Sequence, residues 1–246
     1  MNKNAGLETE QMRPDRVAIL GAMDEEVALV AQGLEGAQHD PKSAQASLDV
    51  VCGSLRRSDG SQVQVAATVG GMGTVNIAAS AQYLIDSYHP QALIFSGIAG
   101  NLNTDLHIND VVLGGTLRYL DSDMRMIAQF APQTADFHSD ARLLKLADAA
   151  LADMGIKHIV GTIATGNYFV DTPEKTAEVK EQTGADAVEM EGAAVCHVAA
   201  RNHVPALVIR ALSDNADTDY EVFKEFDISE YANTASKLVL NIISRL

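Results

Sequence analysis

The 246-residue sequence has little of what marks several common protein classes. It contains no tryptophan, six tyrosines and six phenylalanines, so rings that could stack on a ligand are scarce. Its two cysteines, Cys52 and Cys196, stand far apart and form no Cys-x-x-Cys pair. This pattern argues against a disulfide framework and a cysteine-based zinc site, and it favours a reducing cytoplasmic environment.

Positive charge is also scarce. Asp and Glu number 33 against 18 Lys and Arg, which gives a net charge of −15 without any basic tract. Such a surface repels nucleic-acid phosphates and anionic lipids, so we expect no nucleic-acid and no membrane partner. No apolar run reaches the ~20 residues that a membrane-spanning helix needs. Residues 1–15 are polar, and we interpret them as a flexible N-terminal tail rather than a signal peptide.

Two kinds of catalytic signature are missing as well. The seven histidines are dispersed and no pair has His-x3-His spacing, so we predict no metal site. No serine stands in a Gly-x-Ser-x-Gly motif, which argues against a Ser-His-Asp hydrolase. The apolar share of 47% with 21% charged residues is nevertheless ordinary for a globular chain with a sizeable core.

Apolar runs of strand length alternate with helix-spaced patterns along the chain. This alternation predicts an α/β fold, with a mostly parallel or mixed sheet between helices. The predicted strands are 16–20, 47–55, 62–69, 92–95, 110–120, 158–164, 187–191 and 206–212. The predicted helices are 24–34, 74–88, 139–154, 172–183, 192–202 and 228–246, with a loop at 121–138. No Pro/Gly-rich linker divides the chain, so we expect residues 16–246 to form a single domain.

Two carboxylates end the apolar run Ala-Val-Glu-Met-Glu at 187–191. Side chains alternate along a strand, so Glu189 and Glu191 are expected on one face, with Val188 and Met190 on the other. In open α/β sheets, ligands bind beyond the carboxyl ends of the strands. Carboxylates at that place can accept hydrogen bonds from a pair of sugar hydroxyls.

A second acidic group, Asp24-Glu25-Glu26, follows the first predicted strand. Acidic residues in the first turn of a helix complement its dipole, which is a sufficient account of Asp24 and Glu25. Glu26 could instead lean back over the sheet edge. Apolar neighbours there would raise its pKa and allow it to act as a general base.

Two glycine-rich segments, 69–74 and 96–100, also follow strands. Glycines allow backbone amides to approach a ligand closely. The first segment lacks the third glycine of a dinucleotide-binding motif, because Asn76 stands at that place. A Rossmann site is therefore disfavoured, and a plain tight turn remains an alternative. The second segment, Ser-Gly-Ile-Ala-Gly, is predicted to be a loop.

The last predicted strand carries three further candidates. Ser213 and Asp214 either cap a helix or hydrogen-bond a bound heterocycle. Arg210 interrupts the apolar run, and a buried arginine needs an anionic partner, so a carboxylate from another loop is expected to face it. Elsewhere, Phe169 follows strand 158–164 and either belongs to the core or offers a ring on which a purine could stack.

These pieces occur in an order that closely resembles the 5′-methylthioadenosine/S-adenosylhomocysteine nucleosidases, within the nucleoside phosphorylase/nucleosidase superfamily. The matching segments are GAMDEEV (21–27), GGMGTVNIA (70–78), SGIAGNL (96–102), ATGNYFV (164–170), AVEMEGAAV (187–195) and VIRALSDNAD (208–217). The resemblance runs from about residue 16 to the C-terminus. It implies a nucleoside phosphorylase-like three-layer α/β/α sandwich around a twisted mixed sheet, and a cytoplasmic homodimer that needs no cofactor.

Members of that family cleave the N-glycosidic bond of 5′-thioadenosines and release adenine and a thioribose. The resemblance implies that Glu26 activates the attacking water. It also implies that Asp214, with Ser213 beside it, protonates adenine at N7 or shares a proton with it. Glu191 would hold the ribose hydroxyls, and Arg210 would organise the water and Glu191.

The same resemblance implies the residues that surround the nucleoside. Met190 would lie under the sugar, and Glu189 would support a neighbouring donor. Phe169 would stack on the base and the Val170 backbone would read the purine edge. Met72 would line the pocket near the thioribose.

Three departures from the family pattern concern the 5′ end of the substrate. Ile98 stands where many members carry a small hydroxyl residue, segment 120–123 lacks a common histidine, and segment 124–137 does not follow the usual loop. A nucleosidase acting on another 5′ group, such as 6-amino-6-deoxyfutalosine, is therefore the alternative. A phosphorylase is less favoured, because hexameric phosphorylases place an arginine where this chain has Phe95. A binding protein without turnover is expected to lack Glu26 or Asp214, and both are present.

Overall fold

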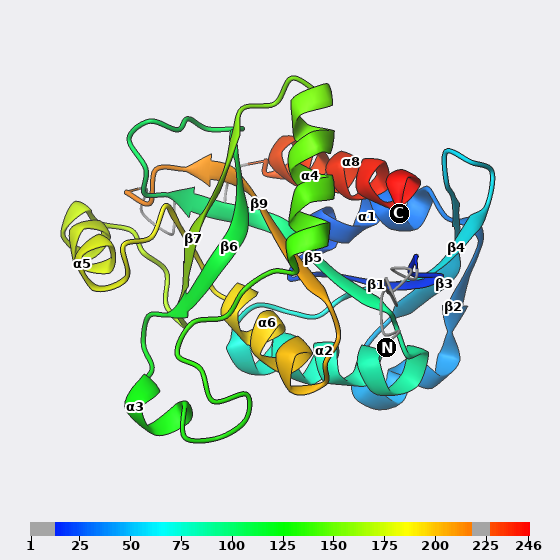
Figure 1. Ribbon diagram of the computed structural model, residues 1–246, viewed down its shortest axis with the longest axis horizontal. Coiled ribbons are helices and arrows are strands. Elements are labelled where there is room, and N and C mark those ends of the chain that lie inside the picture. The colour runs from blue at the N-terminus through cyan, green and yellow to red at the C-terminus, as the bar shows by residue number, and fades with distance from the viewer. Residues whose placement is uncertain (1–12, 218–226) are drawn as a thin grey trace, which may run out of the picture.

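The computed structural model describes residues 13–217 and 227–246. Within these residues a mixed sheet lies between two layers of helices (Figure 1), which confirms the predicted α/β fold. The strands are β1 (Arg16–Gly21), β2 (Glu35–Asp40), β3 (Val50–Arg56), β4 (Gln62–Val69), β5 (Ala92–Asn101), β6 (Val111–Tyr119), β7 (His158–Thr165), β8 (Ala187–Glu189) and β9 (Ala206–Asp214). The helices are α1 (Asp24–Gln32), α2 (Thr74–Tyr88), α3 (Met124–Ile127), α4 (Ala141–Asp153), α5 (Pro173–Thr183), α6 (Gly192–Arg201) and α8 (Ser229–Arg245), with a 3-10 helix at Pro41–Ala46.

The sheet order is β2-β3-β4-β1-β5-β8-β7-β6-β9, and β9 also pairs with β5. The strands β5, β8, β7, β6 and β9 therefore close into a ring. The pairings of β5 with β9 and of β6 with β7 are parallel, while β5 with β8 and β6 with β9 are antiparallel. This closure gathers the carboxyl ends of β5 and β9 beside β8 and the loop that follows β7.

Two apolar cores hold the layers together. One lies beneath α1, α4 and α8 and includes Val30, Leu151 and Ile242, whereas the other lies beneath α2 and α6 and includes Leu84 and Val195. The central strand β5 contributes to both cores, since its side chains alternate between faces and all are apolar over 92–95. Each core is thus assembled from elements that are distant in sequence.

Two strand predictions around the glycine-rich and acidic segments are wrong in their boundaries. The predicted loop at 96–100 is strand, because parallel pairing with β9 continues through Gly100. Conversely, β8 ends at Glu189. Glu191 is the N-cap residue of α6, with φ −138° and ψ −36°. The expected single-strand alternation therefore does not extend to Glu191.

Other differences have simple physical reasons. Strand β2 was not predicted, because its sequence EGAQHD is polar and exposed and shows no apolar alternation. The predicted loop 121–138 contains the short helix α3. Of the predicted tail at 1–15, residues 1–12 lie outside the described residues, while Arg13 pairs with Asp59 and donates to the carbonyl of Leu246. No helix of the described parts is long and apolar enough to cross a membrane.

Candidate active site

A cavity of about 330 Å³ opens where the carboxyl ends of β1, β5 and β9 meet β8 and the loop after β7. Ten of the eleven predicted site residues line it: Glu26, Met72, Ile98, Phe169, Val170, Glu189, Met190, Glu191, Ser213 and Asp214. The eleventh, Arg210, is fully buried behind the carboxylates and is not part of the lining. The structure thus brings together residues from six separate segments of the sequence.

Glu26 stands in the first turn of α1 and is only 2% exposed. Its carboxylate is held by backbone amides: Ala22 and Met23 donate to Oε2 at 2.6 and 3.1 Å, and Ile98 donates to Oε1 at 3.0 Å. Burial raises the pKa of Glu26, against the lowering effects of Arg210 and these amides. The group is fixed in place and is a better proton acceptor than an exposed carboxylate.

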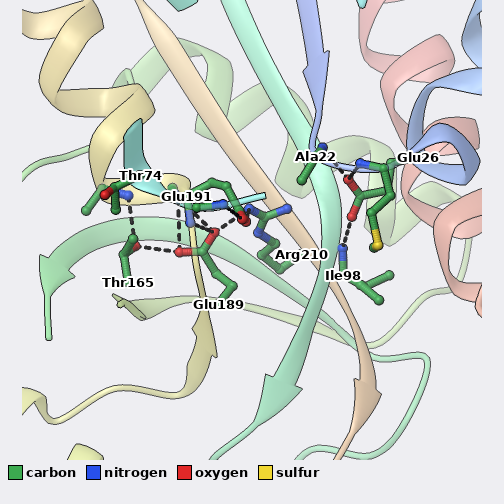
Figure 2. A network of polar contacts seen from close by, with 12 residues as sticks. Ala22, Glu26, Thr74, Ile98, Thr165, Glu189, Glu191 and Arg210 are labelled. Atoms are coloured by element: carbon green, nitrogen blue, oxygen red, sulfur yellow. Dashed lines mark hydrogen bonds and ion pairs between the residues drawn. The ribbon is translucent and has the colours of Figure 1, made fainter. Parts of the chain in front are cut away.

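Arg210 lies among three carboxylates (Figure 2). Its Nη2 contacts the carboxylate of Glu189 and lies 3.4 Å from Oε2 of Glu191, while Glu26 stands on the other side of the guanidinium. The guanidinium also lies 4.0 Å from the ring centroid of Phe95. The expectation that an anionic partner faces Arg210 is confirmed, and three carboxylates against one cation leave this part of the site electronegative.

The backbone of Gly97 packs closely against the side chains of Glu26 and Arg210. A Cβ at this position would lie 2.2 Å from Oε1 of Glu26 and 2.3 Å from Nη1 of Arg210. Nη1 is buried and has no hydrogen-bond partner among the described residues. A carboxylate oxygen and an unsatisfied donor therefore lie close together beside Gly97, where the backbone leaves no space for a side chain.

We expect Gly97→Ala to damage both stability and activity. Overpacking at a site with no free volume costs about 1–3 kcal/mol, and displacing Glu26 by about 1 Å lowers kcat/KM by roughly 10²-fold. Urea unfolding and steady-state kinetics measure the two effects. Gly33→Ala is the matched control, since a Cβ there has no neighbour closer than 3.4 Å. Wild-type kinetics in Gly97→Ala would contradict the crowding that the structure shows.

Glu189 is engaged almost entirely by protein donors. It accepts hydrogen bonds from the Thr165 hydroxyl, from Gly192 N at 2.7 Å and from Glu191 N at 3.1 Å, besides its contact with Arg210. The Glu189 side chain thereby supplies acceptors to the amides at the start of α6. Its oxygens are occupied by protein donors, so the prediction that one carboxylate of the pair faces a sugar now rests on Glu191.

Glu191 connects two helix starts. Its Oε1 accepts a hydrogen bond from Gly73 N, at the start of α2, over 2.7 Å. Burial and the neighbouring Glu189 carboxylate raise the pKa of Glu191 to about 7, against the lowering effect of Arg210. A carboxyl group with this pKa is partly protonated near neutral pH, so it can either accept or donate a hydrogen bond.

Asp214 is the last residue of β9 and is 7% exposed. Its Oδ2 accepts from the Ser213 hydroxyl at 2.8 Å and its Oδ1 accepts from Ala216 N at 2.7 Å. Ala216 has φ +54°, a left-handed conformation that aims its amide back at the carboxylate. Burial raises the pKa of Asp214 against both hydrogen bonds. The group is poised to hold a proton that a weakly basic ligand atom could receive.

The remaining wall is apolar. Phe169 is half-buried and lines the cavity beside Val170. Met72 is 52% exposed at the rim. Sequence reasoning missed Met23, Asn167 and Tyr168, which also line the cavity. Asn167 and Tyr168 stand within the matching segment ATGNYFV, and this was the signal that could have identified them.

The described parts of the chain contain no group of three or more His, Cys, Asp or Glu side chains placed to hold a metal ion. Residues 16–244 match the phosphorylase superfamily. The chain is 34% identical to the 5′-methylthioadenosine/S-adenosylhomocysteine nucleosidase of Shewanella pealeana, across 94% of this chain and 100% of that protein.

Solved structures give the same result. The nucleosidase of that name from Neisseria meningitidis, in complex with methylthio-immucillin-A, superposes with a TM-score of 0.85 at 29% identity, covering 94% of this chain and 100% of the other. The futalosine hydrolase of Helicobacter pylori superposes with a TM-score of 0.82 at 28% identity, covering 94% and 98%. The fold is that of a phosphorylase-superfamily enzyme. Within that superfamily, the chain belongs to the 5′-methylthioadenosine/S-adenosylhomocysteine nucleosidase family.

Proposed function

We propose that this enzyme hydrolyses the N-glycosidic bond of 5′-thioadenosines, among them 5′-methylthioadenosine and S-adenosylhomocysteine, and of 5′-deoxyadenosine-like nucleosides. The observation that carries the proposal is the pair of buried carboxyl groups with raised pKa values, Glu26 and Asp214, in one cavity. Hydrolysis of this bond requires a base for the water and an acid for the departing purine. The two groups supply these two functions.

The attacking water binds to the Glu26 carboxylate, which lines the cavity and therefore faces the bound nucleoside. Glu26 takes a proton from this water as its oxygen bonds to C1′ of the sugar. Arg210 orients the water by donating one hydrogen bond. It remains ionised because Glu189 and Glu191 face it.

Breaking the C1′–N9 bond leaves its electron pair on the purine. Asp214 provides the proton that N7 receives, so adenine departs as a neutral molecule. Phe169 stacks on the base, and Val170 offers backbone groups to the purine edge. The Asp214 carboxylate that results is held by Ser213 and by the Ala216 amide.

The sugar becomes cation-like as the bond lengthens, and nearby carboxylates stabilise that charge. Glu191 accepts hydrogen bonds from the ribose hydroxyls, with Met190 beneath the ring. The carboxylates of Glu26 and Glu189, and that of Glu191 above its pKa, together outweigh the charge of Arg210, which favours the transition state over the neutral nucleoside.

Phosphate is a poor replacement for water in this site. It requires arginines or several convergent donors, whereas Arg210 is already engaged by Glu189 and Glu191. Phe95 is neutral, and Glu26 would repel the anion. These features favour hydrolysis over phosphorolysis.

A different nucleoside substrate is supported by two observations. The H. pylori futalosine hydrolase has the same fold, and segment 124–137 departs from the family pattern near the expected 5′ end. A nucleosidase that accepts 6-amino-6-deoxyfutalosine is therefore the alternative within the same chemistry.

We also propose that the enzyme acts as a cytoplasmic homodimer in the salvage of methionine-derived nucleosides, with residues 16–246 as one domain. Apolar side chains are exposed on and after α3, where Met126 is 61% and Phe130 is 72% exposed. Burying them against a second copy would remove apolar surface from water. Sedimentation equilibrium tests this: a mass of one chain at micromolar concentration would overturn the dimer.

The test of function is adenine release from 5′-methylthioadenosine, S-adenosylhomocysteine, adenosine and inosine, with and without phosphate. We expect thioadenosines to be cleaved at the same rate in both buffers and inosine to be a poor substrate. Strict dependence on phosphate would contradict hydrolysis. Cleavage of 6-amino-6-deoxyfutalosine alone would select the alternative substrate.

A further inference from the structure

The start of α2 lacks a side-chain cap of its own, because its N-cap residue is Gly73. Two neighbouring amides there are satisfied from elsewhere in the chain. Gly73 N donates to Glu191, and Thr74 N donates to Oδ1 of Asn167 at 2.9 Å. The Thr74 hydroxyl donates to the same oxygen at 2.9 Å. Asn167 thus supplies a cap to a helix that lies 93 positions earlier in the sequence.

Asn167 is also bound on its other side. Its backbone amide and its side-chain Nδ2 donate to Oδ2 of Asp121, at 2.7 and 3.1 Å. The amide side chain therefore uses its oxygen towards Thr74 and its nitrogen towards Asp121. A carboxylate at position 167 could satisfy Thr74, but it would face the Asp121 carboxylate without a proton between them.

The location of Asn167 gives these contacts a consequence for the ligand. Asn167 lines the cavity two residues before Phe169, and its Oδ1 lies 3.4 Å from the position of a Cβ on Gly73. The sugar-facing carboxylate Glu191 and the loop 166–170 are thereby attached to adjacent amides of one helix. Their spacing is fixed by the rigid start of α2.

We propose that Asn167 is a positioning residue that holds the base-binding loop 166–170 in register with Glu191, through Thr74 on one side and Asp121 on the other. The inference rests on the proposed function, because it assigns the loop to the base and Glu191 to the ribose. It adds a residue that contacts the helix and the loop but takes no part in proton transfer.

The test is Asn167→Asp, which retains size and the acceptor for Thr74 but sets a charge against Asp121. We expect the KM for 5′-methylthioadenosine and the Kd for adenine to rise about 10- to 100-fold, the range for losing hydrogen bonds that involve a charged group. We expect kcat to change less than about threefold, since the base contacts are made equally in the ground and transition states.

Exchange of the two residues provides the rescue. In the double variant Asn167→Asp/Asp121→Asn, the amide introduced at 121 can donate to the carboxylate introduced at 167, and its oxygen can accept from the backbone amide of 167. We expect both KM and Kd to return to within about threefold of wild type. Asp121→Asn alone is the control, because a single acceptor oxygen remains for both bonds and no repulsion is created.

Calorimetric titration with adenine separates this inference from the proposed function, since it needs no turnover. If wild type binds adenine but cleaves no nucleoside, the proposed function is wrong and the Kd series still tests the positioning. Unchanged KM and Kd in Asn167→Asp would overturn the inference. So would a folded double variant that shows no recovery. Should Asn167→Asp not fold, Asn167→Ala removes the side-chain contacts with both Thr74 and Asp121, and an unchanged KM there would equally overturn it.

Discussion

Glu26→Gln lowers kcat by about 10²–10⁴-fold, the usual contribution of a general base, while the protein remains folded. Glutamine has the shape of glutamate, and its oxygen can still accept from the Ile98 amide or from the Ala22 and Met23 amides. It cannot accept a proton from water. The measurement is the rate of adenine release from 5′-methylthioadenosine, together with circular dichroism and the Kd for adenine.

The neighbouring residue gives a matched control for this variant. Glu25 lies in the same first turn of α1 but is exposed, so Glu25→Gln removes an equal charge outside the cavity. We expect its kcat to stay within about twofold of wild type, as surface substitutions generally do. Full activity in Glu26→Gln would remove Glu26 from the mechanism, whatever the control shows.

Asp214→Asn lowers the rate of adenine release by about 10²–10⁴-fold, because the purine then departs without its proton. A substrate whose leaving group is stable as an anion does not need that proton. With 4-nitrophenyl β-D-ribofuranoside we therefore expect a loss of at most about tenfold. Glu26→Gln should be impaired with both substrates, since both require activated water.

The exposed Asp217, three residues further along, offers the control substitution Asp217→Asn. Asp217 makes the smallest of the contributions that raise the pKa of Asp214, so the rate of this variant with each substrate should stay within about threefold of wild type. An equal loss in Asp214→Asn with the purine and the nitrophenyl substrate would show that Asp214 binds or orients the nucleoside. It would then not be the acid.

Much of this site could be predicted from the sequence because local patterns indicate where the strands end. The acidic turn after β1, the glycines before α2 and the Ser213-Asp214 pair each follow a predicted strand, so the α/β rule placed them at one edge. The resemblance then named ten residues that do line the cavity. The need of Arg210 for a carboxylate partner could also be predicted, because a buried charge requires an opposite charge whichever residue supplies it.

The rest depended on contacts between distant segments. Strand β5 continues through Gly97 because it pairs with β9 there. The local sequence does not reveal this pairing. Glu189 and Glu191 have different hydrogen-bond partners because β8 ends at Glu189 and Glu191 stands at the N-cap of α6. The contact of Asn167 with Thr74 joins residues whose side chains are unremarkable in sequence. Strand β2 is stabilised by its neighbour β3 rather than by its own polar residues.

The closed ring of five strands also affects how the molecule meets its neighbours. Strand β9 pairs with β5 from Ala206 to Asp214 and with β6 from Ile209 to Ala211, so it has a neighbouring strand on both sides and offers no open edge to another strand. Among the described strands the open edge is β2, which is short, polar and interrupted by an irregularity between Glu35 and Gln38. Such an edge resists strand addition and aggregation. Copies of this enzyme should therefore associate through side chains and not by extending a shared sheet.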